Sequence, residues 1–452
     1  MVGAQIGNMG RACRHIRAWV FGLASVLVFS SASADFQLEH LGLAEGLTQS
    51  NVLALAEDHQ GYLWIGTEAG ISLYDGYQIS PLSLPEGTPD YLETRIQGIH
   101  SAGAMGMWVA TGSGVALISN QGEPRFSSHA EVHPLRPTNK IYAFGEFMLD
   151  CHGRWLVVRD RDIFELSISD GEISQRLVFS DLLETPVGSQ SLSLSISRSV
   201  EAPLLDFNWQ AVLALKDQNG GIWISNHQHL WYRACGEDTF RLQAQIEGND
   251  SAGKVLSSTL IEVDGETLLW STTTGVYQVS NQGSPQKIDI EDSNTHNLKF
   301  GPWALSGDGQ GRIWALSPTQ FGELIRSETP SPATAGNPPW IFHQYFEGPP
   351  PEADNELMTL SFEASVSHDQ LVWARLNNQY IVVDPNRRTV IKQPNLTGMG
   401  AHWTQASRVQ PTPRYRDRFG NIWLFGGLHG LSRYVPSRHR FCEVSNLDAA
   451  LN

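Results

Sequence analysis

The chain has 452 residues, 41% hydrophobic and 10% aromatic, so it can fill the core of one large domain or two ordinary ones. Its 31 basic residues against 47 acidic ones give a formal net charge of −16, which argues against nucleic acid as a partner. The 14 Trp and 42 Gly combine large flat side chains with frequent turn residues, a composition that favours many short strands over long helices.

Residues 1–34 have the composition of a secretory signal peptide. Arginines between positions 11 and 17 precede an apolar run from Ala18 to Phe29, and small residues follow up to Ala34. Since a membrane span needs about 20 apolar residues, we expect cleavage after Ala34, with an uncleaved anchor as the alternative. The predicted product is one periplasmic or secreted domain, residues 35–452.

Three cysteines remain after this leader: Cys151, Cys235 and Cys442. An odd and widely spaced set is not a disulfide framework, although one pair can form in an oxidising compartment. The sequence leaves open which pair that is.

Tryptophans recur in matching contexts along nearly the whole chain, at Trp64, Trp108, Trp155, Trp223, Trp270, Trp314, Trp373 and Trp423. The 359 residues from the first to the last divide into seven intervals of about 51, close to the period of four-stranded propeller blades. We therefore predict an all-β fold, a β-propeller of eight blades in one ring, with seven blades as the alternative.

The first repeat shows how one blade is built. Val52 to Glu57 reads as the inner strand, and Asp58 to Gly61 as a tight turn, because Asp bonds nearby backbone amides and Gly supplies a positive φ. Tyr62 to Thr67, Ile71 to Tyr74 and Tyr77 to Leu84 read as the second, third and outer strands. An Asp precedes the Trp by six residues in five repeats, at positions 58, 217, 264, 308 and 417. The Trp itself is expected to pack between neighbouring blades.

Two features outside the repeat bear on the shape of the ring. Phe36 to Leu41 or Arg440 to Val444 can supply the outer strand of the last blade, which would otherwise leave an unpaired edge. The segment from Pro330 to Pro351 holds four aromatic residues between Trp340 and Phe346, and we expect an ordered loop there. That loop either caps the central channel or packs against its own blade.

The stretch from Val52 to Asp75, with its Asp-x-x-Gly-x-Leu-Trp-Ile-Gly-Thr core, resembles the two-component regulator propeller repeat. The resemblance is fair around Trp223 and Trp423 and weak in the other repeats. It implies an extracytoplasmic sensor domain, of the kind found in front of histidine kinases and diguanylate cyclases. Members of the family usually carry an immunoglobulin-like domain, a transmembrane helix and an output module after the repeats, and the sequence after Ala34 shows no pattern typical of these parts. A stand-alone sensor and a truncated reading frame are both open.

Strand parity places the loops that lead into the first strand, and the turns between the second and third strands, on one face of the ring. Such loops surround the central channel, where propellers usually hold ligands. The polar residues at these positions are the predicted ligand-binding set: Gln49, Asn51, Glu68, Ser113, Asn226, His227, Thr273, Arg375 and His429. His227 and His229 have a His-x-His spacing without a third ligand nearby, so we predict no metal and no cofactor.

These features favour an extracytoplasmic ligand-sensing or partner-binding propeller with no catalysis of its own. Its ligand is expected to be a small molecule such as a saccharide fragment, and its partner a membrane-bound kinase or cyclase. The alternative is a secreted propeller enzyme such as a lyase or glycan-active protein, which requires His and carboxylate side chains converging at one channel mouth. A passive scaffold with an apolar rim is a third possibility.

Overall fold

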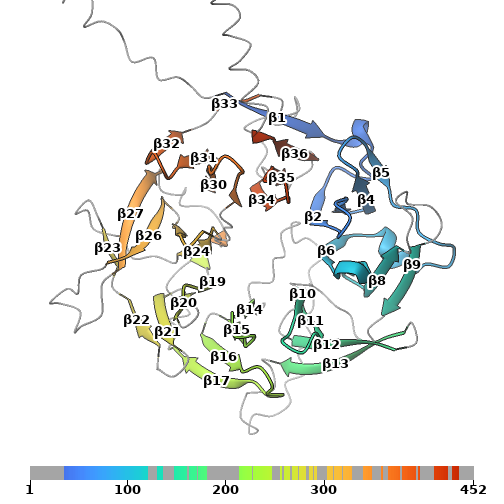
Figure 1. Cartoon of the computed structure of the whole chain (residues 1–452), viewed down its shortest axis with the longest axis horizontal. Helices are drawn as coiled ribbons and strands as arrows, with labels where there is room; N and C mark the ends of the chain where they lie inside the picture. Colours follow the sequence, from blue (N-terminus) through green and yellow to red (C-terminus); the bar gives the residue numbers. More distant parts are fainter. Residues whose placement is uncertain are drawn as a thin grey trace, which may run out of the picture.

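The computed structural model describes residues 35–120 and, with gaps, residues 130–436. The longer gaps are 121–129, 136–146, 181–212, 247–254, 293–302, 328–339, 349–357, 360–364 and 398–411. The sheets stand side by side around one axis and form a closed ring of eight blades (Figure 1). The prediction of an eight-bladed propeller is confirmed, and the seven-bladed alternative is wrong.

Each blade is a sheet of four antiparallel strands, ordered from the ring axis outward. Blade one consists of β2 (Val52–Glu57), β3 (Leu63–Thr67), β4 (Gly70–Tyr74) and β5 (Ile79–Pro81), and blade two of β6 (Ile96–Ser101), β7 (Met107–Thr111), β8 (Val115–Asn120) and β9 (Ala130–Leu135). Blade three consists of β10 (Phe147–Leu149), β11 (Trp155–Arg159), β12 (Asp162–Ser169) and β13 (Glu172–Ser180), and blade four of β14 (Leu213–Lys216), β15 (Ile222–Ser225), β16 (His229–Arg233) and β17 (Arg241–Gln245).

Blades five to eight repeat this order. Blade five consists of β19 (Thr259–Glu262), β20 (Thr267–Thr272), β21 (Gly275–Ser280) and β22 (Gln286–Lys287), and blade six of β24 (Ala304–Gly307), β25 (Ile313–Leu316), β26 (Gln320–Arg326) and β27 (Trp340–Glu347). Blade seven consists of β29 (Ser365–Val366), β30 (Val372–Leu376), β31 (Gln379–Asp384) and β32 (Thr389–Lys392), and blade eight of β34 (Thr412–Arg416), β35 (Ile422–Phe425), β36 (Leu431–Tyr434) and β1 (Asp35–Leu41).

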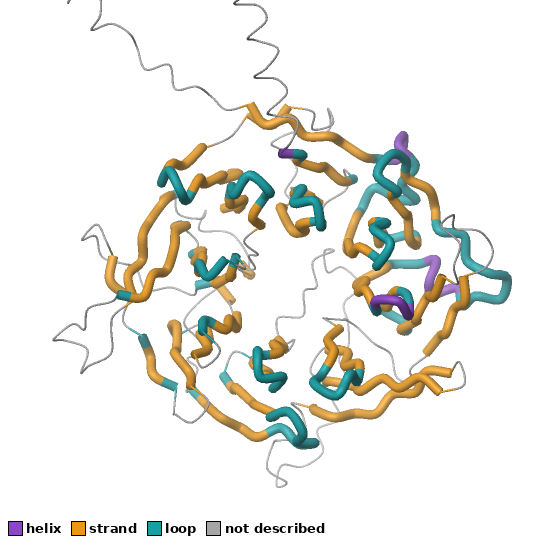
Figure 2. Tube along the Cα trace, in the orientation of Figure 1, coloured by secondary structure: helices purple, strands orange, loops and turns teal. Residues whose placement is uncertain are grey.

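Helices are short in the described part of the chain, as Figure 2 shows in purple. They are the 3-10 turns η1 (Leu43–Glu45), η2 (Asp90–Glu93) and η3 (Gly103–Met105). Within the described residues, no helix is both long and apolar enough to cross a bilayer.

The N-terminal strand closes the ring. β1 pairs antiparallel with β36, with Leu38 opposite Tyr434 and Leu41 opposite Leu431, so it is the outer strand of blade eight. Its other edge is covered by β33 (Asn395–Thr397) in parallel register. Of the two closing segments that the sequence offered, the one from Phe36 to Leu41 is therefore used. The other, from Arg440 to Val444, lies outside the described residues.

Three parallel strand pairs connect segments of different blades. β33 continues from blade seven onto the outer edge of blade eight, and β23 (Ile290–Asp292) continues from blade five onto β27 of blade six. β18 (Val255–Leu256) leads into blade five and pairs in parallel with β28 (Met358–Thr359), which leads into blade seven. Each of these pairs adds backbone hydrogen bonds between blades to the side-chain packing described below.

The aromatic segment after Pro330 is a strand where we expected a loop. Trp340–Glu347 is β27, the outer strand of blade six, and its Trp340, Phe342 and Phe346 side chains are buried. Trp340 and Phe342 share one face of the strand and pack in the cluster between blades five and six, as a period of two requires. A register shift after Gln344 turns Phe346 to the other face, where it packs in the cluster between blades six and seven. Packing against its own blade, the second of the two expectations for this segment, is the one the structure supports.

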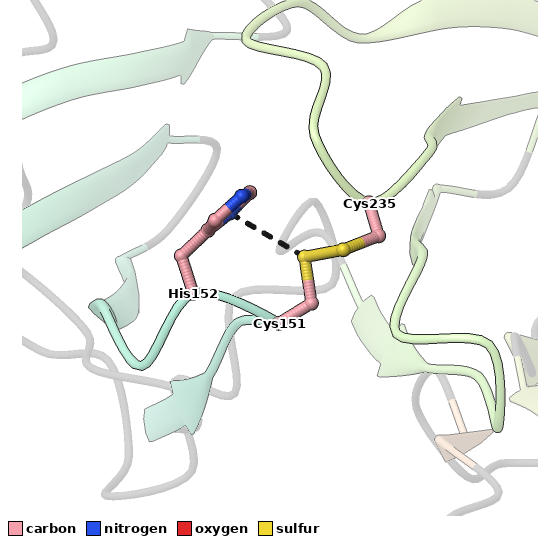
Figure 3. A group of neighbouring side chains, drawn as sticks. All are labelled: Cys151, His152 and Cys235. Atoms are coloured by element: carbon pink, nitrogen blue, oxygen red, sulfur yellow. Dashed lines mark hydrogen bonds between the residues drawn. A yellow bond between two sulfur atoms is a disulfide. The ribbon is translucent and has the colours of Figure 1, made fainter.

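A disulfide joins blades three and four. Cys151, in the turn between β10 and β11, is bonded to Cys235, in the turn between β16 and β17, with a Cα–Cα distance of 5.8 Å (Figure 3). The two residues are 84 positions apart in sequence. Of the three pairings that Cys151, Cys235 and Cys442 allow, the fold therefore selects this one.

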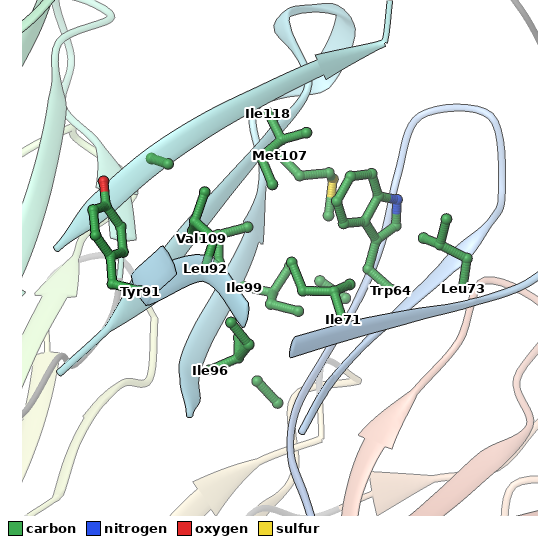
Figure 4. Packing of buried hydrophobic residues seen from close by; sticks show 13 residues of the cluster. Trp64, Ile71, Leu73, Tyr91, Leu92, Ile96, Ile99, Met107, Val109 and Ile118 are labelled. Carbon is green, nitrogen blue, oxygen red and sulfur yellow. The ribbon is translucent and has the colours of Figure 1, made fainter. Parts of the chain in front are cut away.

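The hydrophobic core lies between blades. Trp64 of blade one packs against Ile99, Met107 and Ile118 of blade two, with Ile71 and Leu73 of its own blade beside it (Figure 4). Clusters of the same kind occur at each of the remaining junctions between neighbouring blades. The one between blades eight and one contains Trp423, Leu55 and Ile65. The ring is thus held together by a series of similar interfaces, each built around a repeat tryptophan or its neighbours.

Candidate functional site

The predicted ligand-binding residues belong to one face of the ring, which we call the rim face. It consists of the loops that lead into the inner strands and the turns between the second and third strands of each blade. Backbone hydrogen bonds tie these segments together: Glu68 N donates to Asn51 O at 3.3 Å, and Gly430 N of blade eight donates to Ser50 O at 2.7 Å. Gly70 N likewise donates to Thr94 O, at the start of blade two, at 3.0 Å. The predicted arrangement of loops is therefore present from blade eight to blade two.

Blade one brings three of the predicted residues together. The Gln49 side-chain oxygen accepts a hydrogen bond from Asn51 N, so Gln49 shapes the loop before β2. The Asn51 and Glu68 side chains are half-buried, and neither hydrogen-bonds another residue in the described ranges. Within the described residues these two side chains are therefore unlike Gln49, whose side chain holds its own loop.

Hydroxyl side chains hold several rim turns in place. Thr67 Oγ1 donates to Gly70 O at 2.9 Å, and it accepts from Ala69 N at 3.1 Å. Thr111 makes the same contacts in blade two, donating to Gly114 O at 3.2 Å and accepting from Ser113 N at 3.2 Å. The predicted Ser113 is exposed at the tip of this turn. The threonines are structural residues that our sequence analysis missed, although both stand three positions after the repeat tryptophan.

Asn226 occupies this turn-capping position in blade four. Its side-chain oxygen accepts hydrogen bonds from Gln228 N at 2.8 Å and His229 N at 2.7 Å. An Asn at the start of such a turn replaces a backbone acceptor. The structure thus gives Asn226 a role in shaping the turn.

Arg375 lies at the rim end of β30 in blade seven, opposite Tyr380 in the ladder with β31. Its side chain is half-buried. Burial raises the pKa of the Tyr380 phenol above its usual range, and the positive charge of Arg375 opposes that rise. Arg375 therefore supplies a positive charge on the rim face, on a different blade from Glu68.

The remaining predicted residues, His227, Thr273 and His429, lie outside the described residues. Of the nine, blade one holds Gln49, Asn51 and Glu68 side by side, while Ser113, Asn226 and Arg375 stand on three other blades. The described rim face offers amide, hydroxyl, carboxylate and guanidinium groups. This set suits hydrogen bonding to a polar ligand.

Comparison with known proteins gives a family match in the first blade. The family described as Two component regulator propeller matches residues 46–69, which run from the loop before β2 to the turn after β3. No curated protein matches the chain.

Solved structures with a similar fold include virginiamycin B lyase from Staphylococcus aureus, at 10% identity and a TM-score of 0.44, over 88% of this chain and 99% of that one. Another is the extracellular domain of a putative hybrid two component system from B. thetaiotaomicron, at 14% identity and a TM-score of 0.28, over 88% of this chain and 58% of that one. At such identities and scores these structures do not bear on function. The resemblance drawn from the sequence is borne out in the first blade, where residues 46–69 match the two component regulator propeller repeat.

Proposed function

We propose that this protein is an extracytoplasmic sensor propeller, which binds a small polar solute on its rim face and passes that information to a membrane-bound signalling partner. The observation that carries the proposal is the family repeat in blade one, whose half-buried Asn51 and Glu68 side chains lie on the rim face. A saccharide fragment is the first ligand class to test, because hydroxyl groups complement amide and carboxylate side chains.

Two further features support binding in an extracytoplasmic compartment. The Cys151–Cys235 disulfide suits an oxidising environment, and the sequence before Asp35 has the composition of a secretory leader. We propose that the chain binds its ligand without chemical conversion, and that its output is exerted by a histidine kinase or diguanylate cyclase. Its acidic charge makes nucleic acid a poor partner.

Thermal denaturation in the presence of a saccharide library tests the sensing function. A ligand that binds only the folded protein stabilises it by about 2.7 kcal/mol at a concentration of 100 times Kd, so the melting temperature rises. A broad library that gives no shift would contradict the proposal.

The location of the site is tested with two carboxylate variants. Glu68→Gln removes a charge from the rim face, and Glu172→Gln removes one from the opposite face, at the exposed start of β13. We expect the ligand-induced shift to be reduced in the Glu68→Gln variant and retained in the Glu172→Gln variant. Equal shifts in both variants would place the ligand elsewhere on the ring.

A further inference from the structure

The turn between β10 and β11 differs from the corresponding turns of other blades. It begins with Asp150, whose Oδ1 accepts from His152 N at 2.9 Å and from Arg154 N at 2.9 Å. Gly153, at φ +76, completes the turn. Its two central residues, Cys151 and His152, are both ligands for soft metal ions. The turn therefore has the same hydrogen-bonded backbone as in other blades, but it carries two side chains that can bind a metal ion.

A second turn meets it across the interface between the blades. Cys235 lies between β16 and β17, where Glu237 N donates to Ala234 O at 3.1 Å. The approach is close: a side-chain carbon added at Gly220 of blade four would come within 2.8 Å of the Cys151 Cβ. Two tight turns, each fixed by its own hydrogen bonds, thus hold the sulfur atoms in place.

The three side chains gather at one point on the surface. Cys151 Sγ lies 3.4 Å from His152 Nδ1, and the two sulfur atoms and this nitrogen all lie within 4.8 Å of one another (Figure 3). Cys151 is half-buried, while His152 and Cys235 are exposed. Solvent, a metal ion and an external thiol can all reach the group.

The distance between Cys151 Sγ and His152 Nδ1 is close to the one that a zinc site requires. Zinc binds thiolate sulfur at about 2.3 Å and imidazole nitrogen at about 2.0–2.1 Å with tetrahedral angles, so ligating N and S atoms lie about 3.6 Å apart and two S atoms about 3.8 Å apart. The pair formed by Cys151 and His152 is already close to the first value. Once the disulfide is broken, rotation of two cysteine side chains whose Cα atoms are 5.8 Å apart can provide the second.

We propose that Cys151, Cys235 and His152 form a redox-controlled metal site, which is a covalent link between blades three and four when oxidised and a zinc site when reduced. An external dithiol transfers two electrons to the Cys151–Cys235 disulfide. The sulfur–sulfur bond breaks, and an equivalent bond forms in the dithiol. The two protons that the dithiol gives up go to solvent when Zn²⁺ takes the two thiolates and the His152 imidazole as ligands. Water occupies the fourth position.

Metal titration of the purified protein tests this site, with Co²⁺ as the spectroscopic probe and Zn²⁺ in competition with a chromophoric chelator. The protein is reduced with a phosphine and freed of reductant without air, in a Cys442→Ser background. We expect one equivalent of Co²⁺ to bind to the reduced protein with thiolate-to-cobalt absorption, to be displaced by Zn²⁺, and not to bind to the oxidised protein.

Three variants distinguish this site from adventitious binding. Cys235→Ser should abolish the thiolate absorption, and His152→Ala should weaken Zn²⁺ binding at least tenfold. His59→Ala is the matched control, because His59 is an exposed histidine in the corresponding turn of blade one, and it should change nothing. Near-ultraviolet circular dichroism of a Cys151→Ser/Cys235→Ser double variant shows whether the ring stays folded without the link.

Absence of Co²⁺ binding in a reduced protein that retains its near-ultraviolet spectrum would overturn the proposal. So would Zn²⁺ binding of equal strength in the wild type and the His152→Ala variant. The cysteines would then serve only as a covalent link between blades.

Discussion

At the scale of single residues, the repeat aspartate has two tasks in one side chain. Asp58 Oδ1 accepts from the backbone N–H groups of Gln60, Gly61 and Tyr62, while its Oδ2 accepts from Trp64 Nε1 at 3.1 Å. The same bond between the turn aspartate and the indole occurs at Trp223, Trp314 and Trp423, at 3.1, 3.3 and 2.9 Å. The spacing of six residues thus links the turn to the packing of the blades.

Other blades have the tryptophan without this bond. Among the described residues, the buried indole nitrogens of Trp108, Trp270 and Trp373 have no acceptor. In blade five the aspartate is present, but Asp264 is exposed and pairs with Arg326 at 3.4 Å. Asp264 keeps the turn role that the sequence predicted, since its Oδ1 accepts from Thr267 N at 2.8 Å, but it makes no bond to the Trp270 indole.

This difference predicts unequal costs for the same substitution in blades one and two. Trp64→Phe leaves the buried Asp58 Oδ2 without its donor, while Trp108→Phe removes a nitrogen that has no described acceptor. We expect Trp64→Phe to lower the free energy of unfolding by about 1–3 kcal/mol more than Trp108→Phe. Chemical denaturation of both variants measures the difference, and equal losses would contradict the assigned role of Asp58.

At the scale of elements, the aspartate of the turn between β10 and β11 forms ion pairs with arginines, where other blades have a hydrogen bond from the tryptophan indole to the turn aspartate. Asp150 Oδ2 pairs with Arg154 Nε at 2.8 Å within the turn, and with the buried Arg233 of β16 at 3.4 Å across the interface. Burial alone raises the pKa of the Asp150 carboxyl. Hydrogen bonds from Arg154 and His152, together with the charge of Arg154, outweigh that effect and leave the pKa below its usual value.

The lowered pKa gives the Asp150 contact a defined dependence on pH. An unfolded Asp titrates near pH 3.9, so ionised Asp150 stabilises the fold above that value, and its contribution is lost as the pH falls through the lower folded pKa. We expect Asp150→Asn to be destabilising by a constant amount above about pH 5, and by less below about pH 4. Melting temperatures of both proteins across this range check the prediction. A constant difference down to acid unfolding would show that ionisation of Asp150 is unimportant.

At the scale of the whole molecule, stability depends on joining the two ends of the described chain. Phe36 of β1 is buried between Trp373 of blade seven and Tyr434 of blade eight, with ring centroids 5.1 and 5.5 Å away. On the other side of blade eight, Arg418 N donates to Glu57 Oε2 of blade one at 2.9 Å. A ring closed in this way has no bare strand edge at the junction.

Removal of the Phe36 side chain should therefore weaken the whole ring. We expect Phe36→Ala to lower the free energy of unfolding by about 3–5 kcal/mol, the cost of emptying a buried aromatic site. Tyr77→Ala is the control, because this aromatic side chain is 96% exposed on blade one, and we expect a change within about 0.5 kcal/mol. Thermal melts of the two variants compare these effects. If the two variants melt alike, β1 is not needed for closure.

The local pattern of the sequence was sufficient to predict the strands of each blade and the number of blades. The apolar inner strand, the turn at Asp58, the strand around Trp64 and the number of blades follow from contacts within about 25 residues, which a repeat displays directly. Predicted and observed strands of blade one agree closely except at the outer strand, which is only Ile79–Pro81. The short outer strand has few residues to carry an alternating pattern.

Only the tertiary structure decided how distant segments meet. It selected Cys235 as the partner of Cys151, β1 as the closing strand, and burial in blade six for the aromatic residues of β27. It also separated Asn51 and Glu68, whose side chains have no hydrogen-bond partner in the described structure, from Gln49 and Asn226, which hold their own turns. Such choices depend on which groups approach across blades and on which polar atoms are already satisfied. A sequence pattern with a period of two or of about 51 residues predicts neither the contacts across blades nor which polar atoms are satisfied.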